Sequence, residues 1–430
     1  MIGTPRVLIA SAFGRGNWLS VKLTQMGFNV QLIDVTEKLG ATSKEDREGP
    51  FGYFDLRQWG NEEQAALNAL GPVREVAGGF TLWLKSGPWE LRGATSIHRA
   101  QVLKQYDSAW PLVHQFGDVN GDRKLWIDKL KDLDFEERWS ASLASDLMSN
   151  QSHWPNEAFL KSIPVSLFEP YFSRVPERRN YKTGLKWCED RGVVVVEGAE
   201  IPDVAIENRK VLGLEVRSDK SGFVKCHHLI WMLSSMETAH FSPRCFLKLY
   251  KGQMMEPEWC WIRYKIDFES SPDIASMPEE FLFIENINLP WAHDNYAIFR
   301  QSLYEHSYHV WLKLPYSQRF HRDYLQERIH PLIENIQKRN PRLKAIKTTL
   351  PAEASSHLKE LGAPLFPIYR SSDLAQSLGV KLKNLKFSHP EYWPSFSWGS
   401  IFTSQNQISA ELRRWWGEMS DEQKQKELEL

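Results

Sequence analysis

The apolar residues at the start of the chain change from strand spacing to helix spacing and back. Residues 6–10 form a short apolar run, and residues 17–26 place apolar side chains at helical spacing until Gly27 ends the run. A second β-rich run, FNVQLIDV, covers 28–35 and contains Asp34 near its end. Together they predict a βαβ unit of about 30 residues, the size of a mononucleotide-binding half.

The pattern further along the chain predicts a second sheet and more helices. The expected elements are a hairpin at 78–93 that turns at Ser86–Gly87, helices at 97–160, a helix–strand–hairpin–strand unit at 181–233 whose hairpin turns at Glu207–Arg209, antiparallel strands at 258–314, a helix at 317–339 and an extended piece at 362–369.

The turn between the first strand and helix is the main chemical feature of the sequence. Dinucleotide-binding βαβ units carry G-x-G-x-x-G at this place, and here Ser11, Phe13 and Gly16 occupy the three glycine positions. Phe13 puts a ring where the second glycine lets phosphates approach bare backbone, although Gly14 takes over that role if the turn shifts. The candidate phosphate-binding turn consists of Ser11, Phe13, Gly14, Arg15 and Gly16.

The turn alone leaves two interpretations open. The helix N-terminus offers N–H groups and a positive dipole end to a phosphate. Asp34 follows about 20 residues later, where a carboxylate accepts a ribose hydroxyl. The other interpretation is a Rossmann-like βαβ unit with an empty pocket.

The segment LIDVTEKLGAT, residues 32–42, adds a family resemblance. With the opening, it resembles the flavin-dependent amine oxidase, phytoene desaturase and protoporphyrinogen oxidase superfamily, where the acidic residue precedes a G-G-R element. Asp34 and Gly40 match that pattern. Ala41 and Thr42 depart from it, and without the arginine Thr42 lacks a usual phosphate contact.

Two later segments are similar to the same family. The element order of 181–233 matches the family's second nucleotide segment, which implies that the backbone of Ile201 approaches the adenine. The last segment, SFSWGSIFTSQNQISAELRRWW, predicts the C-terminal helix, with Thr403 or Ser404 as N-cap. The resemblance implies that the flavin lies near the start of this helix, although the family's glycine–aspartate pair is missing.

We therefore expect an α/β fold with a Rossmann-like FAD/NAD(P)-binding domain built from discontinuous segments, plus an α+β substrate domain with an antiparallel sheet. The expected division is dinucleotide-binding segments at 1–75, 176–245 and 386–430, and substrate-domain segments at 76–175 and 246–385.

The net charge and the apolar content of the chain limit the kinds of partner that it can bind. The formal net charge of −1 gives no bulk field for nucleic acid or an anionic membrane. No run reaches the roughly 20 apolar residues of a membrane span, while peripheral membrane contact stays open. The 18 tryptophans favour an apolar pocket for a small-molecule substrate. The oligomeric state is left open.

The remaining polar groups suggest neither a metal site nor secretion. The four cysteines lack zinc spacing, which indicates reduced thiols in a cytoplasmic protein, and no signal peptide opens the chain. Two histidine pairs, His227–His228 and His306–His309, fall on opposite faces of their expected strands, so we expect no metal.

Three functions are compatible with the sequence. The resemblance implies an FAD-dependent oxidoreductase that acts on an apolar or amine substrate, since flavin chemistry needs no catalytic sequence signature. The departures at the phosphate contacts favour a cofactor-free member of the fold that acts as a binding or scaffold protein. A nicotinamide-dependent dehydrogenase is the third, because Asp34 also suits an NAD ribose. No catalytic residue is identified.

Overall fold

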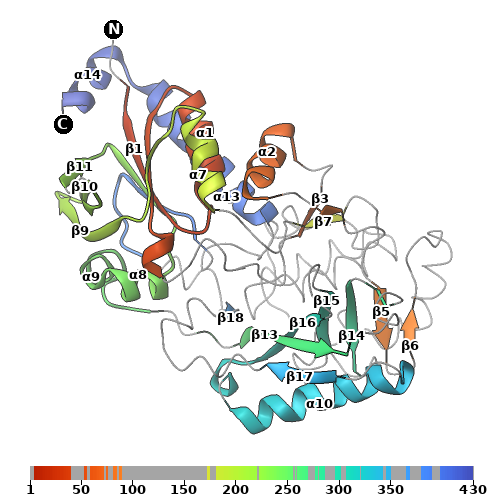
Figure 1. Ribbon diagram of the computed structural model, residues 1–430. Helices are drawn as coiled ribbons and strands as arrows, with labels where there is room; N and C mark the ends of the chain where they lie inside the picture. Colours follow the sequence, from red (N-terminus) through yellow and green to blue (C-terminus); the bar gives the residue numbers. More distant parts are fainter. Residues whose placement is uncertain are drawn as a thin grey trace, which may run out of the picture.

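The structure is a computed structural model that describes residues 4–39, 53–55, 59–71, 74–75, 81–84, 87–89, 172–174, 181–219, 222–254, 257, 259–269, 277–278, 280–285, 296–301, 307–319, 321–341, 345–349, 365–368, 379–389 and 398–429. Within these residues, one parallel sheet and one larger antiparallel sheet form the two centres of the molecule (Figure 1).

The parallel sheet is assembled from distant parts of the chain. Its described strands run in the order β19-β12-β1-β2-β8. Their bounds are β1 Arg6–Ser11, β2 Asn29–Asp34, β8 Val194–Val196, β12 His228–Trp231 and β19 Leu385–Phe387. All these pairings are parallel, so the carboxyl ends of the strands share one edge. The strand order reverses at β1, which places a topological switch point between β1 and β12.

Both faces of β1 are covered, which explains why its sequence is a continuous apolar run. Val7 and Ile9 pack against one layer of helices, while Leu8 and Ala10 pack against the opposite layer. The helices on the first face are α1 Asn17–Gln25, α2 Asn61–Leu70, α7 Tyr181–Glu189 and α13 Trp398–Glu418. The elements on the second face are β9 Glu200–Glu207, β10 Lys210–Arg217, β11 Gly222–Lys225 and α9 Pro243–Tyr250, with α8 Ser235–Phe241 beside them.

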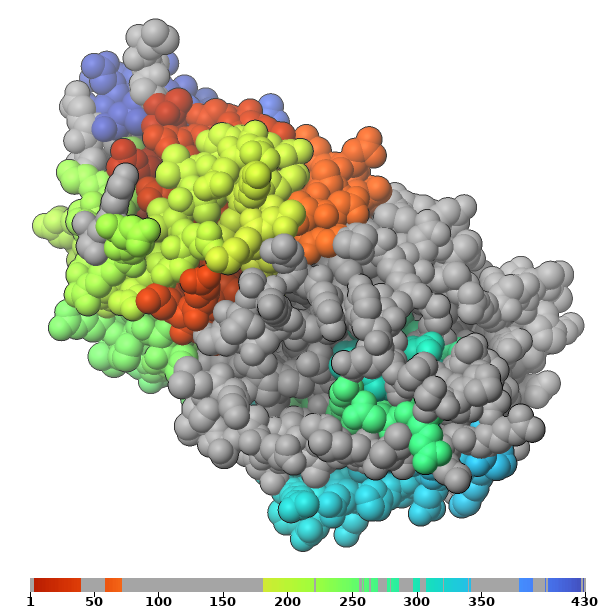
Figure 2. All heavy atoms as spheres, in the orientation of Figure 1, coloured from red at the N-terminus to blue at the C-terminus, as the bar shows by residue number. Residues whose placement is uncertain are grey.

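The helices on the first face meet at a glycine. A Cβ on Gly184 of α7 would lie 2.5 Å from Asn17 Nδ2 and 2.8 Å from Leu70 Cδ2. Gly184 therefore lets α1, α2 and α7 approach closely, and Figure 2 shows the segments that contain them as one continuous surface.

The antiparallel sheet packs one face on a long helix. Its described order is β17-β13-β16-β15-β14-β5-β6, and β18 also pairs with β13. The β14–β5 pairing is parallel, and the other pairings are antiparallel. The bounds are β5 Thr81–Leu84, β6 Gly87–Trp89, β13 Trp259–Phe268, β14 Glu280–Ile284, β15 Tyr296–Gln301, β16 Ser307–Pro315, β17 Ala345–Thr349, β18 Leu365–Ile368, with η3 Tyr316–Gln318 and α10 Arg322–Arg339 following β16. Alternate residues such as Phe299, Val310 and Leu312 pack on α10.

The opposite face of this sheet is not purely apolar. The Arg300 side chain is fully buried, its Nη2 lies 2.9 Å from Glu280 Oε1, and its guanidinium lies 4.7 Å from the centre of the Trp311 ring. This face of the sheet therefore includes a buried ion pair beside a tryptophan.

The remaining described elements are short or terminal. They are η1 Thr36–Leu39, β3 Tyr53–Asp55, β4 Arg74–Glu75, β7 Phe172–Arg174 and α14 Asp421–Glu429. None of the helices in the described residues has the length and apolar composition needed to cross a membrane.

The expected fold class is confirmed, and so are many of its elements. The opening βαβ unit, the hairpin whose turn holds Asn208 and Arg209, and the antiparallel strands all form. The helix expected at 317–339 is divided into η3 and α10. The helices expected at 97–160 lie outside the described residues.

The contact at Gly184 predicts opposite effects for two helical glycine-to-alanine changes. Alanine favours a helix over glycine by up to about 1 kcal/mol. At Gly417 no atom lies within 4 Å of a built Cβ, so Gly417→Ala should leave stability unchanged or raise it. Gly184→Ala should lower it by about 1–3 kcal/mol through overpacking. Urea unfolding of both variants measures this, and equal effects would contradict the packing account.

Candidate functional site

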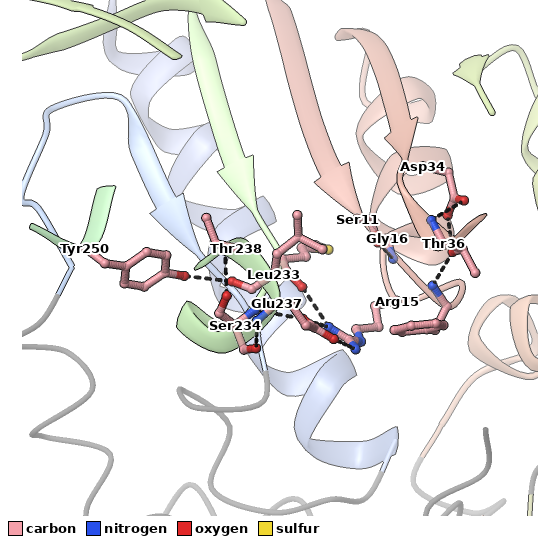
Figure 3. A network of polar contacts seen from close by, with 12 residues as sticks. Ser11, Arg15, Gly16, Asp34, Thr36, Leu233, Ser234, Glu237, Thr238 and Tyr250 are labelled. Atoms are coloured by element: carbon pink, nitrogen blue, oxygen red, sulfur yellow. Dashed lines mark hydrogen bonds and ion pairs between the residues drawn. The ribbon is translucent and has the colours of Figure 1, made fainter. Parts of the chain in front are cut away.

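The candidate site lies at the carboxyl edge of the parallel sheet, where the expected turn follows β1 (Figure 3). Doubly wound sheets bind their ligands in the crevice at this edge, next to the switch point. Ser11 ends β1, Asp34 ends β2, and Met232 follows β12. The structure therefore brings the first two segments of the expected site together.

The turn itself adopts a conformation that hides its aromatic ring. Phe13 and Gly14 both have left-handed backbone, with φ of 58° and 73°. The Phe13 ring is only 7% exposed and packs edge-on against Tyr181, with 5.8 Å between ring centres. A Cβ on Gly14 would lie 2.6 Å from Leu70 Cδ2, so the turn also needs glycine next to α2.

Three N–H groups of the turn bond within the chain. The Phe13 N–H donates to Thr36 Oγ1 at 2.8 Å, and the Gly16 N–H donates to Ser11 Oγ at 2.9 Å. The Arg15 N–H donates to the carbonyl of Ala12 at 3.2 Å. Anion sites at helix N-termini depend on N–H groups that lack such partners.

Asp34 is buried rather than presented to a ribose. Its side chain accepts two hydrogen bonds from Thr36, at 3.1 Å from the backbone N–H and 2.9 Å from the hydroxyl, and Asp34 is 2% exposed. Burial raises the pKa of Asp34 to about 7, and the Thr36 bonds oppose this only in part. The same hydroxyl accepts the Phe13 N–H, so Asp34, Thr36 and Phe13 form one chain of hydrogen bonds.

The residue expected to contact adenine lies in the second layer of the parallel-sheet unit. Ile201 lies in β9, its side chain is 1% exposed, and its carbonyl accepts the Cys245 thiol at 3.6 Å. A groove of about 480 Å³ lies near this end of the sheet, lined by charged residues of η1, α7 and the β8–β9 link. Ion pairs such as Lys182–Glu197, at 3.0 Å, lie along it.

An ion pair crosses the switch point. The Arg15 guanidinium makes two hydrogen bonds to Glu237, at 2.8 and 2.5 Å, and a third to the carbonyl of Met232 at 3.1 Å. The two side chains are 12% and 9% exposed. Burial, the largest single effect, raises the pKa of Glu237, but the Arg15 charge and the hydrogen bonds from Arg15 and Ser234 together outweigh it and hold the pKa below its usual value.

The C-terminal segment reaches the same edge. Gln405 Nε2 donates to the carbonyl of Arg15 at 2.6 Å, and the Ser404 hydroxyl lies 3.0 Å from that of Ser388, which follows β19. The expectation that Thr403 or Ser404 caps this helix is wrong, because α13 begins at Trp398 and both residues lie inside it.

A buried histidine lies beyond β19. His389 Nε2 is 3.0 Å from the Tyr250 hydroxyl, which donates to the carbonyl of Leu233 at 2.7 Å. Burial, together with the Arg15 charge, holds the pKa of His389 well below its usual value, so the ring is neutral.

Several residues at this edge carry no signal in the dinucleotide motif. Thr36, Tyr181, Glu237 and Gln405 occupy it without belonging to the glycine turn. The sequence S-x-x-E at 234–237 predicts a capping box, which α8 has, but it gives no indication of the Arg15 contact. Gly40 and Thr42 of the expected site lie outside the described residues.

Comparison with known proteins identifies the fold. No protein-family model and no curated protein sequence matches the chain. An oxidoreductase from Methanosarcina mazei is 9% identical with a TM-score of 0.52, and the match covers 94% of this chain and 99% of that one. A putrescine oxidase is 12% identical with a TM-score of 0.53, and the match covers 95% of this chain and 99% of that one. A myxobacterial chondrochloren halogenase, one of the FAD-dependent halogenases, is 11% identical with a TM-score of 0.51. That match covers 99% of this chain and 78% of the halogenase.

The fold is that of FAD-binding Rossmann-type oxidoreductases. A halogenase and an oxidase match about equally well, so the comparisons do not single out the amine oxidase and desaturase superfamily. At these identities the likeness describes the fold and not the substrate.

FAD, the cofactor that this fold implies, does not fit the residues as they are arranged. The second glycine position holds a buried ring, the ribose carboxylate is bonded to Thr36, and the crevice at the switch point holds Arg15 and Glu237.

The buried state of Asp34 predicts a pH dependence of stability. A carboxyl whose folded pKa is raised stabilises the fold fully below its unfolded pKa near 4, and this contribution is lost as pH rises through about 7. The loss is on the order of 4 kcal/mol by linkage. As the pH rises from 4 to 8, the free energy of unfolding of the wild type should decrease relative to that of the Asp34→Asn variant. Parallel urea-unfolding profiles would contradict the assignment.

The position of the Phe13 ring predicts a core-like mutational effect. Phe13→Ala should lower the free energy of unfolding by about 3 kcal/mol, because it removes a buried ring and leaves φ unchanged. Phe223→Ala is the matched control, since Phe223 is 51% exposed and should cost less than about 1 kcal/mol. If Phe13→Ala is as mild as the control, the ring does not belong to the core.

Proposed function

We propose that this protein keeps the fold of the FAD-dependent oxidoreductases without holding the dinucleotide, and that it acts as a binding or scaffold protein. The observation that carries the proposal is the occupied edge of the parallel sheet. Phe13, Thr36 and the Arg15–Glu237 pair lie at the places where a dinucleotide needs bare backbone, a ribose acceptor and an open crevice.

The cost of opening this edge supports the proposal. Breaking a buried ion pair costs about 3–5 kcal/mol. Each 1.4 kcal/mol weakens binding about tenfold. A diphosphate could pair with Arg15, but it would leave the Glu237 carboxylate buried beside a second anion. These costs together would remove most of the affinity that a dinucleotide could gain.

An FAD-dependent oxidoreductase is the second candidate. The convergence of Ser11, Met232 and Gln405 from distant segments favours it, because a cofactor in this fold binds where such segments meet. Its substrate would be an amine or an apolar molecule held in the second domain. This function requires Arg15 to release Glu237.

Flavin content and ligand-induced stability distinguish the two candidates. The purified protein should be colourless, and the supernatant after heat denaturation should show no flavin fluorescence. Added FAD at about 1 mM should not raise the melting temperature, whereas a Kd near 1 μM would add about 4 kcal/mol of stability. A stoichiometric yellow flavin, or a clear melting shift with FAD, would overturn the proposal in favour of the oxidoreductase.

A further inference from the structure

Arg15 makes contacts that join all three discontinuous segments of the described parallel-sheet unit. It belongs to the turn after β1, its guanidinium contacts the segment after β12, and its carbonyl accepts Gln405 of α13. Glu237 lies 222 residues after Arg15 in the sequence, and Gln405 lies 390 residues after it. Figure 3 shows the Arg15 side chain extending from the turn toward Glu237.

The geometry of the pair is that of a strong contact. Both guanidinium Nη atoms bond the carboxylate, one to each oxygen, which is the bidentate arrangement in which arginine binds best. Glu237 Oε2 also accepts the backbone N–H of Ser234 at 2.8 Å, as part of the capping box of α8. The carboxylate therefore fixes Arg15 and the start of α8 together.

The ion pair lies at the place where this class of sheet binds its ligand. In this class of sheet, the bound ligand lies in the crevice at the switch point, across the carboxyl ends of neighbouring strands. Here the Arg15–Glu237 pair spans from the end of β1 to the segment that follows β12. We propose that this pair is an internal clasp, which closes the crevice and, with the Gln405 bond to the Arg15 carbonyl, joins the three segments in place of a bound dinucleotide.

The clasp rests on the proposed function, because the ion pair can replace the dinucleotide only in a protein that does not bind it. Its test therefore uses contacts between segments rather than flavin binding. The closing experiment is run without FAD, so a failure of the clasp and a failure of the proposed function give different results.

A double-mutant cycle measures the coupling. The variants are Arg15→Met, Glu237→Gln and the double variant, and urea unfolding gives the midpoint of each. Each single variant should lower the midpoint, and the double variant should lower it by less than the sum. The matched control is Lys38→Met with Glu200→Gln, an ion pair of 2.8 Å whose side chains are 42% and 48% exposed. That cycle should show little coupling.

Amide hydrogen exchange tests whether the pair ties segments together. In Glu237→Gln, exchange should rise about tenfold at the start of α13 and in 232–241, while β1 and β2 stay protected. Additive single effects, or unchanged exchange at α13, would overturn the clasp. If Arg15→Met does not fold, Arg15→Lys keeps the charge but loses the bidentate geometry. Exchange in Arg15→Lys equal to the wild type would also overturn it.

Discussion

The Arg15–Glu237 ion pair is the contact on which the arrangement of the cofactor edge depends. It lies at the switch point of the parallel sheet, between the turn after β1 and the segment after β12. A buried arginine and a buried carboxylate each need a partner, because desolvation of a lone charge costs several kcal/mol. Because Arg15 and Glu237 are paired with each other, a ligand that binds either one leaves the other as an unpaired buried charge.

The same physical features explain both the fold and its occupied edge. A glycine turn, a helix N-terminus and a carboxylate at the end of β2 are what a dinucleotide site requires. In this chain the turn N–H groups bond to Ser11, Ala12 and Thr36, and Asp34 bonds to Thr36. These donors and acceptors of a cofactor site remain, but each of them bonds within the protein.

The sequence predicts the elements of this fold better than the state of its site. Apolar spacing identifies the βαβ unit, and the order of elements in 181–233 places the second segment, because each depends on local periodicity. The direction of the Phe13 ring depends on a φ of 58°, and the partner of Arg15 lies 222 residues away. No local pattern encodes either one. The start of α13 at Trp398 also falls before its expected cap at Thr403 or Ser404.

A crystal structure grown in millimolar FAD tests the central claim most directly. The account predicts that Phe13 stays packed against Tyr181, that Arg15 stays paired with Glu237, and that no dinucleotide density lies along the sheet edge. An extended dinucleotide over Gly14, with Arg15 turned from Glu237 toward its phosphates, would contradict it.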